Sequence, residues 1–168
     1  MKQAIAGVSP PELGEATTMI VWPSLAAFAL GRLLGRLYGL KFGWGAFRLG
    51  RLFLLLAVPI ALVLYFVRLL PGIFQRYRLT NRRVVVEGGF GGEALRAVEL
   101  DDFDAIGIEV WPGQAWYHAG NLIFSNGPVE TFRLRGVSRP EAFRHVCLEA
   151  QRAYVGVASA LRQQAASA

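Results

Sequence analysis

Hydrophobic and polar positions divide this chain of 168 residues into three parts. Residues 1–18 are small and polar and contain Pro10 and Pro11, which predicts an extended arm. Residues 19–74 are mostly apolar, and residues 75–168 alternate with a period of two before changing to a helical period. The pattern therefore predicts an arm, an apolar helical region and one small folded domain.

The longer candidate helix of the apolar region covers residues 50–71. Its centre, Leu52–Val67, has sixteen residues without a charge between Arg51 and Arg68. At about 1.5 Å per residue this run covers roughly 24 Å, whereas the hydrocarbon core of a bilayer is about 30 Å thick. Because arginine side chains at both ends can snorkel to the headgroups, we expect a transmembrane helix here.

The first apolar stretch, residues 19–40, is a different kind of segment. Only thirteen residues, Met19–Gly31, precede Arg32, which is typical of an interfacial or re-entrant helix. A first transmembrane crossing is the alternative; it would make a hairpin and leave the following domain in the cytoplasm. A single crossing would place the domain outside the cytoplasm. Basic residues lie on both sides of the predicted transmembrane helix, so the excess of positive charge on cytoplasmic loops does not distinguish the two topologies.

Four glycines at a spacing of four follow in this region: Gly31, Gly35, Gly39 and Gly43. In a helix they form a stripe without side chains that allows another helix to approach closely. The stripe predicts either a packing face for a partner membrane helix or a glycine-rich linker on the membrane surface.

The domain at residues 75–168 is predicted to contain about seven short antiparallel strands followed by one helix. The clearest pair surrounds Asn126-Gly127, the dipeptide preferred in tight hairpin turns. The helix is expected at 138–163, because Ser138, Pro140 and Glu141 match a helix start and apolar residues then recur at helical spacing. The fold class expected is α+β: a membrane-associated helix and a transmembrane helix, then a small β-barrel or sandwich capped by a C-terminal helix.

Charge is distributed unevenly along the chain. The net charge is +6, and residues 16–86 contain ten basic residues and no Asp or Glu. Basic residues beside an apolar segment indicate contact with anionic lipid headgroups rather than with nucleic acid. The residues expected at headgroups are Trp22, Arg32, Arg36, Arg51, Arg68, Arg76 and Arg78. For Arg76 and Arg78, the alternative interpretation is that their side chains lie on strand faces exposed to water.

The sequence contains no catalytic, cofactor-binding or metal-binding set that matches a known spacing. His118 and His145 have no ligand residue at a metal spacing, and Cys147 lies on an apolar helix face. We therefore expect no enzyme activity, no cofactor and no metal.

One turn-rich segment contains more aromatic residues than solubility requires. Trp111, Trp116, Tyr117 and His118 occur close together in a turn-rich connection. They predict either docking of a partner or rings that cover the open end of a small barrel.

The run Tyr77–Gly89, YRLTNRRVVVEGG, resembles the bacterial pleckstrin-homology-like (PH-like) membrane family, in which Tyr-x-Leu-Thr-(Asn/Asp)-x-Arg follows membrane helices. The resemblance covers roughly residues 75–160. It implies a bent, seven-stranded antiparallel sheet with a C-terminal helix, at the cytoplasmic face of the bacterial inner membrane. It implies no catalytic residue.

Together these features lead us to expect a non-enzymatic membrane protein whose PH-like domain serves as a docking or scaffold module. One alternative is an accessory subunit of a large membrane complex, such as a photosynthetic or respiratory assembly. A second is a module that binds anionic phospholipid. The expected partners are anionic headgroups and other membrane-protein subunits.

Overall fold

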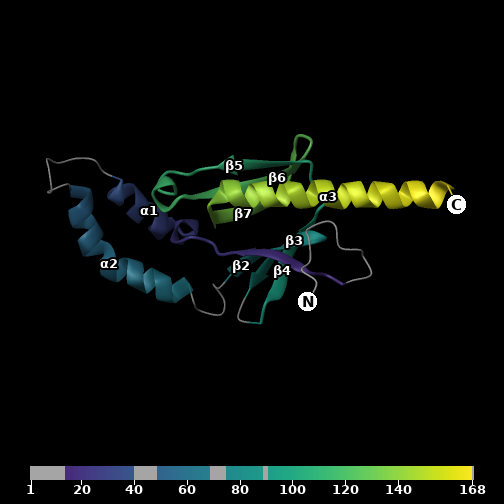
Figure 1. Cartoon of the computed structure of the whole chain (residues 1–168). Coiled ribbons are helices and arrows are strands. Elements are labelled where there is room, and N and C mark those ends of the chain that lie inside the picture. Colours follow the sequence, from purple (N-terminus) through teal and green to yellow (C-terminus); the bar gives the residue numbers. More distant parts are fainter. Residues whose placement is uncertain (1–13, 40–48, 69–74, 89–90, 168) are drawn as a thin grey trace.

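A computed structural model describes residues 14–39, 49–68, 75–88 and 91–167, with side chains of α2 described from 57 to 67. Two antiparallel sheets and three α-helices form the described part of the chain (Figure 1). The strands are β1 (Thr17–Val21), β2 (Gln75–Thr80), β3 (Arg83–Gly88), β4 (Glu93–Glu99), β5 (Ala105–Glu109), β6 (Ala119–Asn126) and β7 (Val129–Ser138). The helices are α1 (Ala29–Tyr38), α2 (Leu49–Arg68) and α3 (Pro140–Ser167), with short 3₁₀ turns η2 (Leu25–Ala27) and η3 (Ala115–Tyr117).

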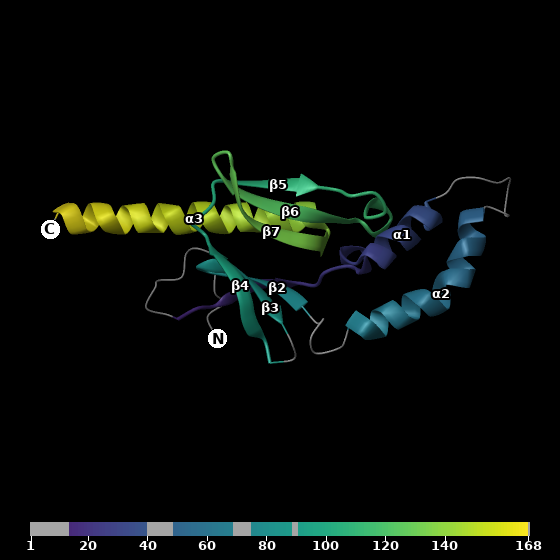
Figure 2. The ribbon, with the colours of Figure 1, turned by 180° about the vertical axis from the view of Figure 1, so that it is seen from behind.

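The seven strands follow a simple up-and-down order. One sheet has the order β1-β2-β3-β4 and the other the order β5-β6-β7. At one corner the two sheets are joined, because Pro23 forms an antiparallel bridge with Val137 and the Ser24 amide donates to the Gly136 carbonyl oxygen (2.7 Å). Away from this corner β7 is the outer strand of its sheet, and it lies on the side facing β2 (Figure 2).

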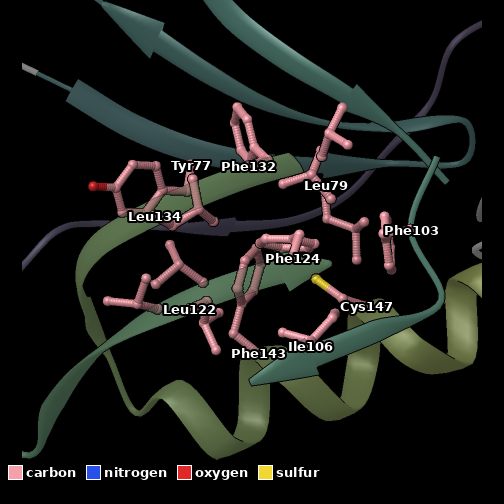
Figure 3. Packing of buried hydrophobic residues seen from close by; sticks show 14 of the residues in the cluster. Tyr77, Leu79, Phe103, Ile106, Leu122, Phe124, Phe132, Leu134, Phe143 and Cys147 are labelled. Atoms are coloured by element: carbon pink, nitrogen blue, oxygen red, sulfur yellow. The ribbon is translucent and has the colours of Figure 1, made fainter. Parts of the chain in front are cut away.

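The core lies between the two sheets and under the first half of α3. Tyr77 and Leu79 come from one sheet, and Phe124 comes from the other (Figure 3). From α3, Phe143 and Cys147 point into the same space, and both are fully buried. Because alternate strand residues face inward, the period-two pattern of the sequence becomes a continuous apolar layer.

The helix α3 begins at Pro140, as the sequence indicates, but its start differs in detail. The Ser138 hydroxyl donates to the Trp22 carbonyl oxygen (3.3 Å), and Arg139 has a positive φ of 51° immediately before the helix. The second half of α3 extends past the sheets (Figures 1 and 2). The expected α+β arrangement of strands followed by a C-terminal helix is present, but residues 75–168 supply six of the seven strands rather than about seven.

One strand comes from a segment for which the sequence indicated something else. Thr17–Val21 was expected in the arm and in a membrane-associated helix, yet it forms β1 and pairs with β2, with Val21 opposite Tyr77. Residues of the YRLTNRR motif (Tyr77–Arg83) hold it there. Asn81 donates its backbone amide to the Ala16 carbonyl oxygen (3.1 Å), and its side-chain oxygen accepts from the Ala16 amide (3.1 Å).

The rest of the motif forms the turn from β2 to β3. The Thr80 hydroxyl oxygen accepts from the backbone amides of Arg82 (3.2 Å) and Arg83 (3.0 Å). The Arg83 guanidinium makes two contacts with the Glu15 carboxylate (2.8 and 2.5 Å). The motif is thus a structural clamp between the β2–β3 turn and the segment that leads into β1.

The predicted transmembrane helix is wrong. In the part of the chain that the structure describes, no helix is long and apolar enough to cross a membrane. The helix α2 does form, but its uncharged run between Arg51 and Arg68 has sixteen residues, about 24 Å, against a core of about 30 Å. The first apolar stretch contributes the ten-residue helix α1, which packs against α2 and η2.

Candidate docking surface

The aromatic loop, residues 111–118 between β5 and β6, is organised around a buried glutamine. The Gln114 side-chain oxygen accepts from the Trp111 amide (2.8 Å), and its side-chain nitrogen donates to the Asn121 side-chain oxygen (2.9 Å). The same Asn121 oxygen accepts from the Gly136 amide (3.0 Å). Because buried polar groups are stable only when hydrogen-bonded, this chain of contacts ties the loop to β6 and β7.

Two glycines of the predicted stripe let α1 pack directly on this part of the fold. A Cβ atom at Gly31 would lie 2.0 Å from the Leu25 carbonyl oxygen, and one at Gly35 would lie 2.2 Å from the Gly113 carbonyl oxygen. Gly113 on the loop side must also lack a side chain, because it has a φ of 92° and a Cβ there would lie 2.0 Å from the Arg32 carbonyl oxygen. Gly31 and Gly35 are therefore packed within this chain. Among the described residues, a Cβ at Gly39 would meet the carbonyl oxygens of Gly35 (3.4 Å) and Arg36 (3.5 Å) at ordinary distances.

Two arginines of α1 also bind the aromatic loop. The Arg32 guanidinium lies 4.9 Å from the Trp111 ring centroid and donates to the Ala27 carbonyl oxygen (3.0 Å). The Arg36 Nε donates to the Pro112 carbonyl oxygen (3.3 Å). A cation above an indole face is attracted by the ring quadrupole. Both guanidiniums thus help to hold α1 against the loop.

Aromatic rings continue from the loop to the end of α1. Trp116 packs against Tyr38 (ring centroids 4.7 Å apart) and against Tyr117 (4.8 Å). Burial raises the pKa of Tyr117 to about 12, and its buried hydroxyl has no hydrogen-bond partner among the described residues. The cluster is therefore apolar in character although each of its rings carries a polar atom.

The helix α2 completes a groove beside these rings. The groove has a volume of about 460 Å³ and is almost entirely apolar. Its lining residues are Leu25, Tyr38, Val58, Ala61, Leu62, Tyr65, Trp116 and Tyr117. Apolar side chains of α2 are exposed both at this groove, where Val58, Leu62 and Tyr65 lie, and beyond it; the six exposed side chains are Val58, Ile60, Leu62, Val63, Tyr65 and Phe66, each between 47% and 59% exposed. We call these six side chains the α2 apolar surface.

Two arginines expected at headgroups lie instead around one buried carboxylate. Glu87 of β3 is 2% exposed and pairs with Arg76 and with Arg78 of β2, the latter at 2.6 Å. Antiparallel pairing places Arg76 directly opposite Glu87. Since two cations face one anion, the trio retains a net positive charge on the outer face of the sheet.

The remaining predicted residues are more dispersed. Trp22 is 41% exposed at the corner where its carbonyl oxygen accepts from Ser138. His118 ends η3 in the left-handed region, with a φ of 48°. The side chains of Arg51 and Arg68 lie outside the described residues. The structure therefore brings together Arg32, Arg36, Trp111, Trp116 and Tyr117, and leaves Trp22 apart.

The described residues show little reactive chemistry. Among them, no group of three or more His, Cys, Asp and Glu side chains is placed to hold a metal ion. His145 lies 3.1 Å from Glu149 on the exposed side of α3, and burial raises the pKa of the Cys147 thiol. A thiol whose pKa is raised in an apolar core is not nucleophilic.

Sequence reasoning missed the residues that hold the surface together. Gln114 looks like an ordinary loop residue, and Glu87 looks like the end of an exposed strand. Nothing in the sequence around Tyr38 or Tyr65 indicates that their side chains line the same groove. The run Pro112-Gly113-Gln114 between two tryptophans was the available hint, because a polar residue inside an aromatic loop needs a partner.

Comparison with known proteins gives one match. The model of a family described as "Bacterial PH domain" matches residues 17–151. A search of curated proteins and a search of solved structures each found no match. The matched range begins at β1 and ends within α3, so it includes the segment between β1 and β2 that carries α1 and α2.

Proposed function

Because this chain belongs to the bacterial PH domain family, we propose that it is a non-catalytic docking module that works at a membrane surface. The observation that carries the proposal is the α2 apolar surface. Contiguous exposed apolar side chains mark interaction sites, because leaving them in water is unfavourable. We assign this surface to the headgroup and acyl boundary of a bilayer, with α2 lying in the plane of the interface.

Charge supports lipid as the occupant. Residues 16–86 contain ten basic residues and no acidic residue, so the whole segment that carries α1 and α2 is attracted to anionic headgroups. Tyr38, Tyr65 and Trp116 border the groove, and amphipathic rings of this kind favour the interfacial zone. The cytoplasmic face of the bacterial inner membrane is the surface that we propose.

Vesicle flotation of the full chain tests the proposal. Phosphatidylcholine vesicles with and without phosphatidylglycerol are the two probes. We expect the wild-type protein to float with the anionic vesicles. The double variant Leu62→Ser/Phe66→Ser removes two exposed apolar side chains from α2, and its partitioning should fall by roughly tenfold or more.

A matched control changes apolar exposure elsewhere. Leu95 is 54% exposed and Val129 is 61% exposed, and both lie on the sheets away from α2. The double variant Leu95→Ser/Val129→Ser should float like the wild type. If the wild type remains at the bottom of the gradient with both vesicles, or if the two double variants behave alike, lipid is not what α2 contacts.

The role of complex subunit has weaker support. This role would use the glycine stripe and the aromatic loop as contacts for a partner, but Gly31 and Gly35 are packed against η2 and that loop. The α2 apolar surface is the part that a partner subunit would have to cover. Binding of the wild-type protein to protein-free vesicles is the result that separates lipid from such a partner.

A further inference from the structure

A second candidate surface lies between the two sheets, beside the outer edge of β7. The sheet order β5-β6-β7 leaves β7 with a strand neighbour on one side only. On its other side, the bridge from Pro23 reaches Val137, and the Ser24 amide reaches the Gly136 carbonyl oxygen. The Tyr77 hydroxyl donates to the Arg135 carbonyl oxygen (2.7 Å), and from Leu134 back to Glu130 no described strand pairs with this edge.

A cleft of about 540 Å³ runs along this unpaired part of β7. One wall is β7 itself, and the facing wall is the inner side of β2, β3 and β4 where the two sheets separate. Its lining residues are Gln75, Tyr77, Val86, Leu95, Arg96, Glu130, Thr131, Phe132, Arg133 and Arg135. A strand edge carries backbone N–H and C=O groups at every second residue that a further strand can pair with.

The charges in the cleft favour an acidic occupant. Arg96 of β4 lies 4.9 Å from the centroid of the Phe132 ring, and neither Arg96 nor Arg135 has an ion pair with a described carboxylate. The acid that lines the cleft, Glu130, is bound by Arg133 at 2.8 Å, and this contact lowers its pKa. Two guanidiniums are thus available for anionic groups.

The apolar residues in the cleft make a free inorganic anion a poor match. Leu95 is 54% exposed on the wall opposite β7, and the Phe132 ring lies beneath the Arg96 guanidinium. A strand presents side chains to alternate sides, so an extended segment can place acidic groups at the arginines and an apolar group at Leu95 while its backbone pairs with β7.

From these features we infer that the outer edge of β7 binds an extended acidic segment of a partner protein by adding it as an eighth strand. The intramolecular bridge at Val137 shows that this edge accepts an antiparallel neighbour at its C-terminal end. The inference rests on the proposed docking function and names the chemistry of what is docked. It uses none of the residues of the α2 apolar surface.

The test uses the full chain in solution without lipid. The probes are an array of octapeptides with Asp or Glu at alternate positions and Val, Ile, Leu, Thr or Phe between them, a matched array with Lys at the acidic positions, and inorganic phosphate. We expect acidic peptides to bind and the Lys array not to bind. Backbone amides of residues 130–135 should gain protection from hydrogen exchange in the complex.

Charge reversal locates the site. The double variant Arg96→Glu/Arg135→Glu should weaken binding of the best acidic peptide by at least tenfold. The double variant Arg144→Glu/Arg152→Glu reverses two exposed arginines of α3 away from the cleft; it is the matched control and should change binding by less than twofold. Thermal unfolding of each variant checks that the fold is retained.

Three outcomes would overturn the inference. They are an acidic array without any binder, peptide binding that leaves the amides of residues 130–135 unprotected, and competition by phosphate showing that a simple anion suffices. Because the vesicle experiment depends on α2 and this one depends on β7, failure of either is distinguishable from failure of the other.

Discussion

Asn81 illustrates how much a single motif residue contributes to this fold. It is 3% exposed and makes three hydrogen bonds to the segment that precedes β1: two with the backbone of Ala16 and one from its side-chain nitrogen to the Gly14 carbonyl oxygen (3.4 Å). Its neighbour Arg83 pairs with Glu15 in the same segment. The motif that reveals the family therefore has a structural role here.

The variant Asn81→Ala is expected to lower the free energy of unfolding by about 1–3 kcal/mol. The Ala16 amide loses its side-chain acceptor, and a partly buried donor without a partner is costly. Urea unfolding followed by circular dichroism measures the change. Gln163→Ala, which removes an exposed polar side chain near the end of α3, is the control. Equal stability of the two variants would contradict a clamp at Asn81.

Glu15 predicts a dependence of stability on pH. The Arg83 guanidinium that binds its carboxylate holds the pKa of Glu15 below its usual value. A carboxyl group whose pKa is lower in the folded state stabilises the fold above its unfolded pKa, and this contribution is lost as pH falls through the folded value.

The variant Glu15→Gln should therefore be less stable than the wild type near neutral pH, and the difference should close as the solution is acidified. Chemical unfolding at a series of pH values measures the gap. Glu93→Gln removes an equal charge from an exposed site without an ion pair among the described residues, which makes it the matched control. A gap for Glu15→Gln that stays constant with pH would contradict the Glu15–Arg83 contact.

At the scale of elements, the contact between α1 and the aromatic loop depends on two facing glycines. Gly35 and Gly113 allow the helix and loop backbones to touch, and Gln114 holds the loop in place from the side of the sheet. The groove beside α2 exists only because this contact sets the position of Tyr38 and Trp116. An internal helix–loop contact thus builds the candidate docking surface.

The variant Gly35→Ala should separate α1 from the loop. Its Cβ would lie 2.2 Å from the Gly113 carbonyl oxygen, so backbone must move, at a cost of about 1–3 kcal/mol. Near-ultraviolet circular dichroism should change as the packing of Trp116 is altered. At Gly39 the nearest atoms to a Cβ are 3.4 and 3.5 Å away, so Gly39→Ala should keep the wild-type spectrum. Identical spectra for both variants would contradict the contact.

At the scale of the whole molecule, the folded body has elements extending from two ends. The segment with α1 and α2 lies at one end, and the C-terminal half of α3 projects at the other (Figure 1). Among the α3 side chains that the structure describes, Tyr154 is the last that packs against the core. Stability should therefore be concentrated in the two sheets and the first half of α3.

Removal of residues 159–168 should change the midpoint of thermal unfolding by no more than about 2 °C, because no side chain described in this range belongs to the core. Differential scanning calorimetry measures the midpoint. Ending the chain after Val146 instead deletes Cys147 and Ala150 from the core, and this shorter chain should not fold cooperatively. A large loss of stability in the first truncation would show that the projecting part of α3 contributes to the fold.

Six of the seven strands and the start of α3 follow from local patterns. Alternating residues, the Asn126-Gly127 turn and the Ser-Arg-Pro-Glu run act over a few positions, so the sequence displays them directly. The seventh strand, β1, did not show a local signal. Thr17–Val21 runs into an apolar stretch, and its partner β2 follows after an insertion of more than fifty residues.

Periodicity was thus sufficient for the α+β class and the strands of the second sheet, and the Tyr77–Gly89 motif was sufficient for the family resemblance, because these features depend on neighbours in the chain. The contact partners of the polar side chains and of the glycines, in contrast, depended on the tertiary fold. Arg76 and Arg78 pair with Glu87 only through strand register, and Gly35 meets Gly113 only after α1 packs on the loop. Contacts between residues far apart in the chain arise from three-dimensional packing, which local patterns do not encode.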